Sequence, residues 1–179
     1  MKIIAFGASY SKNSINKQFA AYAANQFNNA EIEVLDLNNY NVPLFTVDAE
    51  AESGHPDAAK QFLEKLNQAD FLIISMAEHN GSYTAGFKNL FDWTSRVKTK
   101  LFENKKMLLL STSPGARGGF GVIEAAKSRF PIHGANIIDV FSLPHFQDNF
   151  NVENGIVNDE LNTKFEAIIL TIQNKLMEI

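Results

Sequence analysis

Residues 71–97 read FLIISMAEHNGSYTAGFKNLFDWTSRV, and this stretch decides the fold. Its first six residues form an apolar run that contains β-branched isoleucines, which is typical of a strand buried on both faces. A short polar turn with a glycine follows over residues 77–82. From Thr84 onward apolar residues recur at gaps of three and four, which predicts an amphipathic helix. Strand, turn and helix together make half of a βαβ unit, whose turn lies at the carboxyl edge of the sheet, where ligands of open α/β folds bind.

The rest of the chain repeats this alternation of strand and helix. We expect further strands over residues 2–7, 31–37, 105–112 and 136–141, and helices over residues 19–27, 58–68, 122–130 and 160–177. Five strands alternating with helices predict an α/β fold, a doubly wound parallel sheet with helices on both faces. The segments 38–56 and 143–158 are expected to be irregular connections. A length of 179 residues suits one domain, and we expect residues 1–179 to form it.

The composition argues against several classes of protein and site. A formal net charge of -4 offers no broad basic surface for nucleic acid. The chain has no cysteine, which removes disulfides, thiolate catalysis and zinc–thiolate sites. The histidines show no paired metal spacing and no G-x-S-x-G elbow exists, so we expect neither a metal nor a catalytic triad. No apolar run has the length of a signal peptide or a membrane span, which favours a cytoplasmic protein without a membrane partner.

The loop after the first expected strand suits a phosphate. Residues 7–17 read GASYSKNSINK and lead into a helix. Such a loop gathers backbone N–H donors at the positive end of the helix dipole, and the hydroxyls of Ser9, Ser11 and Ser14 and the amide of Asn16 add donors. The GxxxxGK[ST] and GxGxxG motifs are missing, so a single phosphate fits the loop better than a longer nucleotide chain. A serine-rich loop that only caps the helix is the alternative.

Three stretches of the chain resemble one known family. The first stretch consists of Glu78-His79-Asn80-Gly81-Ser82-Tyr83, Gly86-Phe87-Lys88-Asn89 and Asp92-Trp93-Thr94-Ser95-Arg96. It is similar to the "PEYNGS…LKN…DWxSR" block of the NADPH-dependent FMN reductase family, relatives of flavodoxin. The loop before the first helix is similar to the family's "GSxRxxSxN" loop, and residues 113–119 to its "SPGxxGG" turn. Three positions depart from the family pattern: Ser11 replaces an arginine, Ala77 a proline and His79 a tyrosine.

The resemblance implies a flavodoxin-like fold of strand order 2-1-3-4-5, in which the first, third and fourth turns surround one crevice. It implies that FMN binds there, with separate residues for its phosphate and its ring. The phosphate residues are Ser9, Ser11, Ser14, Ile15 and Asn16, and the ring residues are Ala77, Glu78, His79, Asn80, Ser113, Pro114 and Gly115. Because Ser11 supplies no bidentate guanidinium, phosphate binding is either weaker or depends more on Lys12 or Lys17, and the sequence does not choose between these alternatives. Leu44 and Phe45 are candidates for the substrate side of the flavin, with core packing as the alternative.

The activity implied by the resemblance needs no catalytic side chain, since hydride transfer from nicotinamide to flavin is the cofactors' own chemistry. NADPH or NADH is the implied reductant, and the acceptor is a small molecule: free flavin, a quinone, an azo compound or a metal ion. A homodimer or a tetramer is implied as well. Two alternatives stay open, a flavodoxin-like electron carrier without nicotinamide turnover and a fold that has lost its flavin.

His79 carries the sharpest single hypothesis of the sequence. At the family's tyrosine position its charge near neutral pH would tune the flavin potential. The alternative is a partly exposed loop histidine without such a role.

Overall fold

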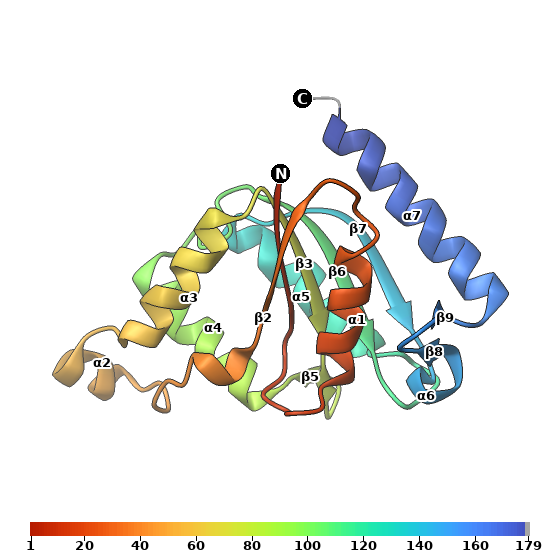
Figure 1. Ribbon diagram of the computed structural model, residues 1–179. Coiled ribbons are helices and arrows are strands. Elements are labelled where there is room, and N and C mark those ends of the chain that lie inside the picture. The colour runs from red at the N-terminus through yellow and green to blue at the C-terminus, as the bar shows by residue number, and fades with distance from the viewer. Residues whose placement is uncertain (178–179) are drawn as a thin grey trace.

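The computed structural model describes residues 1–177, and a five-stranded parallel sheet forms its centre (Figure 1). The strands are Lys2–Gly7 (β1), Glu31–Leu35 (β2), Phe71–Met76 (β3), Lys106–Thr112 (β6) and Asn136–Leu143 (β7). They lie in the order β2-β1-β3-β6-β7, and each neighbouring pair is parallel. Counted along the chain, these strands are the first to the fifth of the sheet, so the expected order 2-1-3-4-5 is confirmed.

Helices cover both faces of the sheet (Figure 1). One face carries Ile15–Ala24 (α1) and Asp159–Met177 (α7), and the other carries Asp57–Gln68 (α3), Ala85–Val97 (α4) and Phe120–Arg129 (α5). The side chains of β1 alternate between the two cores: Ile3 and Ala5 join the α1 side, whereas Ile4 and Phe6 join the α3 side. With both faces buried, the carboxyl edge of the sheet is the place for polar chemistry.

Strand β3 is the middle of the sheet, as its apolar sequence predicts. All six of its residues are buried. Ile73 lies opposite Ala5 of β1 on one side and opposite Leu108 of β6 on the other. The strand therefore brings the turn that follows it to the centre of the carboxyl edge.

The first strand and first helix approach each other closely at Gly7. A Cβ at this position would lie 2.3 Å from the backbone nitrogen of Lys17, so the packing requires glycine. Ser14 is the N-cap of α1, and its hydroxyl accepts a hydrogen bond from the Lys17 N–H at 3.1 Å. The loop between β1 and α1 is thereby held at the carboxyl edge.

The two segments expected to be irregular contain short elements, so that expectation is wrong in part. Segment 38–56 overlaps a 3-10 turn at Leu37–Asn39 (η1) and contains the helix Val47–Ser53 (α2). Segment 143–158 contains Phe146–Asn149 (α6) and the antiparallel pair Phe150–Asn151 (β8) and Gly155–Ile156 (β9). Helix α2 begins because the Thr46 hydroxyl caps it, accepting from the Ala49 N–H at 2.9 Å. None of its residues is buried, and its sequence shows no apolar period.

Polar side chains of α4 hold the segment that leads into α2. Asn89 Nδ2 and Trp93 Nε1 both donate to the carbonyl of Pro43, at 2.8 and 2.7 Å, and Asn89 Oδ1 accepts from the Phe45 N–H at 2.8 Å. Trp93 is only 1% exposed, so it belongs to the interior of the chain. Across residues 1–177, no helix combines the length and apolar character that a membrane crossing requires.

Candidate functional site

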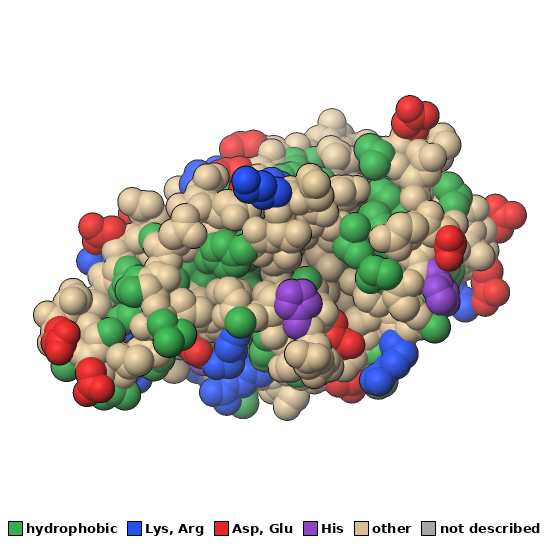
Figure 2. Space-filling model, turned by 90° about the horizontal axis from the view of Figure 1, so that it is seen from below, with side chains coloured by type: hydrophobic (Ala, Val, Ile, Leu, Met, Phe, Trp, Pro, Cys, Tyr) green, Lys and Arg blue, Asp and Glu red, His purple; other side chains and the backbone are tan. Residues whose placement is uncertain are grey.

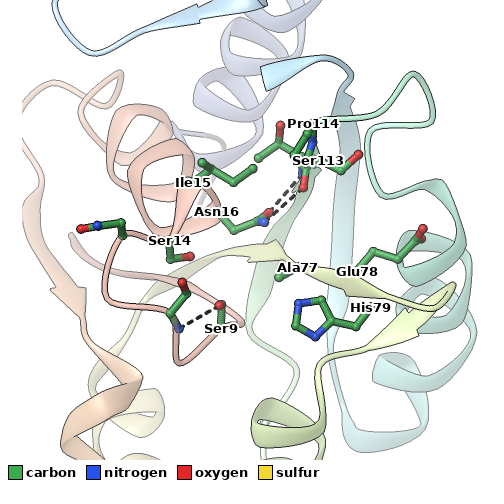
Figure 3. Close-up of a pocket in the computed structure, with 12 residues that line it drawn as sticks. Ser9, Ser14, Ile15, Asn16, Ala77, Glu78, His79, Ser113 and Pro114 are labelled. Carbon is green, nitrogen blue, oxygen red and sulfur yellow. Dashed lines mark hydrogen bonds between the residues drawn. The ribbon is translucent and has the colours of Figure 1, made fainter. Parts of the chain in front are cut away.

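A pocket of about 180 Å³ opens at the carboxyl edge, where three turns of the chain meet (Figure 3). The β1–α1 loop forms one wall, the segment after β3 forms the opposite wall, and the end of β6 closes the space between them. The lining residues are Ser9, Ser11, Asn13, Ser14, Ile15, Asn16, Ala77, Glu78, His79, Thr112, Ser113 and Pro114. Segments far apart in the sequence thus surround one space.

This pocket is lined by all the residues that the sequence analysis assigns to the phosphate or the ring, except Asn80 and Gly115. Asn80 is exposed at the tip of a hairpin, and Gly115 is exposed in the turn after β6. Asn13 and Thr112 line the pocket without having been expected there. The position of Asn13 in the same polar loop as the serines is a sequence signal for a pocket residue. Thr112 ends a buried strand, and nothing in the sequence marks it as a pocket residue.

The turn after β3 is a β-hairpin made of Glu78–His79 (β4) and Ser82–Tyr83 (β5). Asn80 and Gly81 connect the two strands with φ angles of 51° and 77°. Two consecutive positive φ angles are typical of a type I′ turn, for which Asn-Gly is the preferred sequence. The hairpin directs the ring of His79 toward the pocket (Figure 3).

Glu78 fastens this hairpin to helix α5. Its Oε2 accepts a hydrogen bond from the Val122 N–H at 2.7 Å, in the first turn of that helix. A Cβ on Gly121 would lie 2.9 Å from the carbonyl oxygen of Gly81, so the hairpin and the helix start are in close contact. The Glu78 carboxylate turns away from the pocket (Figure 3) and places negative charge at the positive end of α5. Its role in the structure is to order the turn.

The wall formed by the β1–α1 loop combines hydroxyl groups with a helix N-terminus. Helix geometry leaves the N–H groups of Ile15 and Asn16 without an acceptor inside α1. The Ser9 hydroxyl accepts from the Ser11 N–H at 3.1 Å, which curls the loop around the pocket. Backbone N–H groups and hydroxyls at a helix start are the donors that a phosphate group needs.

One of the two lysines that could support such a phosphate is engaged elsewhere. Lys17 Nζ pairs with Asp36 Oδ2 at 2.6 Å, and the Asn38 N–H donates to the same carboxylate at 2.9 Å. The Lys17 ammonium and then the Asn38 N–H lower the pKa of Asp36 to about 2. Lys12 lies in the loop itself and is exposed. Figure 2 shows this face of the molecule, and the hollow near its middle is bordered mostly by uncharged side chains.

Apolar groups complete the pocket. Ile15, Ala77 and Pro114 line it beside the polar donors. Each of the three turns contributes one of them, so the pocket offers neutral donors for a phosphate and apolar surface for a flat ring. A phosphate and a flat ring are the two ends of the flavin mononucleotide that the resemblance implies. In residues 1–177 no three His, Asp and Glu side chains come together as metal ligands.

Leu44 and Phe45 are not among the residues that line this pocket. Phe45 packs edge-on against Trp93, with the ring centroids 4.9 Å apart. Leu44 is 77% exposed. The packing interpretation therefore holds for Phe45, and Leu44 belongs to the outer surface.

Comparison with known proteins finds a matching family model, related sequences and a solved structure of the same fold. The family model described as NADPH-dependent FMN reductase matches residues 1–148. An uncharacterized protein of Mycoplasma pneumoniae is 30% identical over 148 residues, which cover 80% of this chain and 87% of that protein. The NADPH:quinone oxidoreductase of Arabidopsis thaliana is 26% identical over 153 residues, covering 80% and 73%. The structure of FerB, a flavoenzyme NAD(P)H:(acceptor) oxidoreductase from Paracoccus denitrificans, shares the fold with a TM-score of 0.72 at 18% identity, over 97% of each chain.

Replacing Glu78 by alanine is expected to lower the free energy of unfolding by about 1–2 kcal/mol, because the Val122 N–H loses its acceptor and α5 loses a favourable charge. Urea denaturation measures this loss, and faster hydrogen exchange of the Val122 amide localises it. Glu78→Gln keeps an acceptor oxygen and is the matched control. Unchanged exchange of the Val122 amide in the alanine variant would contradict the assigned role.

Proposed function

The chain belongs to the NADPH-dependent FMN reductase family, and from this premise we propose that it transfers a hydride from NADPH or NADH to FMN held in the pocket and then reduces a small-molecule acceptor. The observation that supports the proposal most is the convergence of three turns on one pocket, in which neutral donors of the wall formed by the β1–α1 loop combine with one apolar residue from each turn. FMN bound there would supply the redox chemistry, the exchange of a hydride and a proton between nicotinamide, solvent and acceptor. The residues of the chain bind and orient the reactants.

The wall formed by the β1–α1 loop is proposed to hold the phosphate. Its donors are the N–H groups of Ile15 and Asn16 and the hydroxyls of Ser9, Ser11 and Ser14. All of these groups are neutral, and the Lys17 ammonium is paired with Asp36. Neither Lys12 nor Lys17 lines the pocket, so among the lining groups of this wall the positive end of the α1 dipole is the main electrostatic attraction for the phosphate.

The opposite wall and the end of β6 are proposed to hold the flavin ring. Ala77, His79, Ser113 and Pro114 line this part of the pocket, with Asn80 and Gly115 next to them in the chain. Backbone N–H groups of these turns would stabilise the negative charge that develops on the ring on reduction. Glu78 contributes by holding the hairpin in place.

A quinone is the acceptor class that we propose, because the relative in Arabidopsis thaliana is named as an NADPH:quinone oxidoreductase. A quinone takes two electrons and two protons, so the hydride and the proton received by the flavin balance the reaction. A cytoplasmic location and a single domain over residues 1–179 remain part of the proposal.

We also propose that the protein forms a homodimer. Helix α2 buries none of its residues and projects from the body of the molecule (Figure 1). Val47 at its start is 73% exposed, and Leu44 in the segment that leads into it is 77% exposed. A second copy that covered these side chains would remove apolar surface from water. Sedimentation velocity of the purified protein reports the mass directly, and a monomer would contradict this part of the proposal.

The function is tested by two measurements on the purified protein. After incubation with FMN and desalting, the protein is expected to keep a visible flavin spectrum, and it is expected to oxidise NADPH when FMN and a quinone are present. A colourless protein without turnover would overturn the proposal in favour of a fold that has lost flavin. A yellow protein without nicotinamide turnover would overturn it in favour of an electron carrier.

Substituting Ser11 by arginine is expected to strengthen FMN binding by about tenfold, because a guanidinium adds charge-assisted hydrogen bonds to a phosphate that otherwise meets neutral donors. Quenching of flavin fluorescence measures the dissociation constant. Riboflavin has no phosphate and is the matched ligand, whose affinity is expected to stay unchanged. An equal gain for both flavins, or no gain for FMN, would refute a phosphate position beside Ser11.

His79→Tyr tests whether the histidine tunes the flavin potential. An imidazolium beside the ring favours the reduced, more negative flavin, so the tuning hypothesis predicts an additional rise of the native protein's potential towards acidic pH. The tyrosine variant is expected to lack this additional rise. Spectroelectrochemical titration between pH 5.5 and about 8 makes the comparison, and identical pH profiles for both proteins would eliminate the tuning role.

A further inference from the structure

The side chain of Asn16 is almost completely buried and makes three hydrogen bonds inside the protein. Its Oδ1 accepts from the Ser75 hydroxyl at 2.7 Å and from the Thr112 N–H at 3.1 Å. Its Nδ2 donates to the Thr112 carbonyl at 3.1 Å. Asn16 is 3% exposed, Ser75 0% and Thr112 1%, so water does not compete with these bonds.

These hydrogen bonds join elements that lie far apart in the sequence. Asn16 lies in the first turn of α1, Ser75 near the end of β3 and Thr112 at the end of β6. The Thr112 hydroxyl continues the connection by donating to the Leu143 carbonyl of β7 at 2.7 Å. A single buried network therefore links α1 with three strands at the carboxyl edge (Figure 3 shows its bonds to the end of β6).

The network joins two walls of the pocket directly. Ile15 and Asn16 line the wall formed by the β1–α1 loop, and Thr112, Ser113 and Pro114 line the closing side. The paired bonds between Asn16 and Thr112 fix the separation of these two walls. Any displacement of α1 would break bonds to a buried backbone N–H and a buried carbonyl, which is costly.

An amide is the side chain that this arrangement requires. The position must accept from two donors through one oxygen and donate to a carbonyl through its other atom. Aspartate has the same shape, yet its ionised form has no hydrogen to donate to the Thr112 carbonyl. The protonated form of aspartate has that hydrogen, so its protonation restores the pattern.

We propose that Asn16 is a positioning residue, whose side chain sets the spacing of the pocket walls and binds no part of the phosphate. This inference rests on the proposed function, since it concerns the same flavin site. It changes the role that the sequence resemblance implies for the Asn16 amide, and it leaves the backbone N–H of Asn16 as a phosphate donor. A spacing role affects the ring and the phosphate together, whereas a phosphate contact affects FMN alone.

The test compares FMN with riboflavin in Asn16→Asp at two pH values. At pH 8 the dissociation constants of both flavins are expected to be about ten times those of the native protein at the same pH, because the ionised carboxylate faces the Thr112 carbonyl. At about pH 5.5 both affinities are expected to recover, since burial favours the protonated carboxyl. Glu78 and His79 are the titratable side chains that line the pocket, and the native protein measured at both pH values is the control for them. Loss of FMN binding alone, or no loss at pH 8, would overturn the proposal.

Two further measurements keep the test decisive. Ser75→Ala removes one hydrogen bond of the network, away from the proposed phosphate contacts, and is expected to weaken the binding of FMN and riboflavin equally. It replaces Asn16→Asp in the test if that variant does not fold. Hydrogen exchange of the Thr112 amide needs no flavin and is expected to accelerate in Asn16→Asp at pH 8 relative to the native protein at that pH. A native protein that binds neither flavin contradicts the proposed function, whereas unchanged exchange at Thr112 contradicts the role of Asn16.

Discussion

The burial of both sheet faces is the constraint on which the rest of the structure depends. Every residue of β3 is buried, and the side chains of β1 are divided between two apolar cores. A polar group on either face would lose its water without a partner, at a cost of several kcal/mol on transfer scales that allow no hydrogen bond. Polar side chains that face a ligand therefore collect where the strands end. The pocket lies at that edge because the rest of the sheet is closed to it.

The pocket walls owe their positions to contacts made outside the pocket. Glu78 reaches away from it to α5, and Lys17 turns to Asp36 beside the start of α1. Each contact uses a charged side chain for structure, and each removes that charge from direct contact with a ligand. The resulting cradle relies on N–H groups, hydroxyls and a helix dipole, which position an anion through geometry more than through net charge.

The sequence predicts the strands and the main helices well, because the apolar runs and helical periods are local signals. It also predicts the neighbourhood of the pocket, since polar turns must follow buried strands at one edge of a parallel sheet. Helix α2 is the main omission. Its position depends on Asn89 and Trp93, more than 40 residues further along the chain, which bind the backbone at Pro43 and Phe45. No periodicity within residues 38–56 could show those contacts.

Asn16 illustrates why the role of a site residue is harder to predict than its location. From the sequence, an asparagine at the start of a helix has donors and acceptors that need partners. Either a bound phosphate or a neighbouring backbone group could supply those partners. The outcome depends on where Ser75 and Thr112 lie, and that is decided by the register of β3 against β6. The three bonds of Asn16 therefore express long-range packing, which the spacing of residues within the loop does not encode. A polar residue beside a ligand site is best assigned by first accounting for the buried backbone groups that need it.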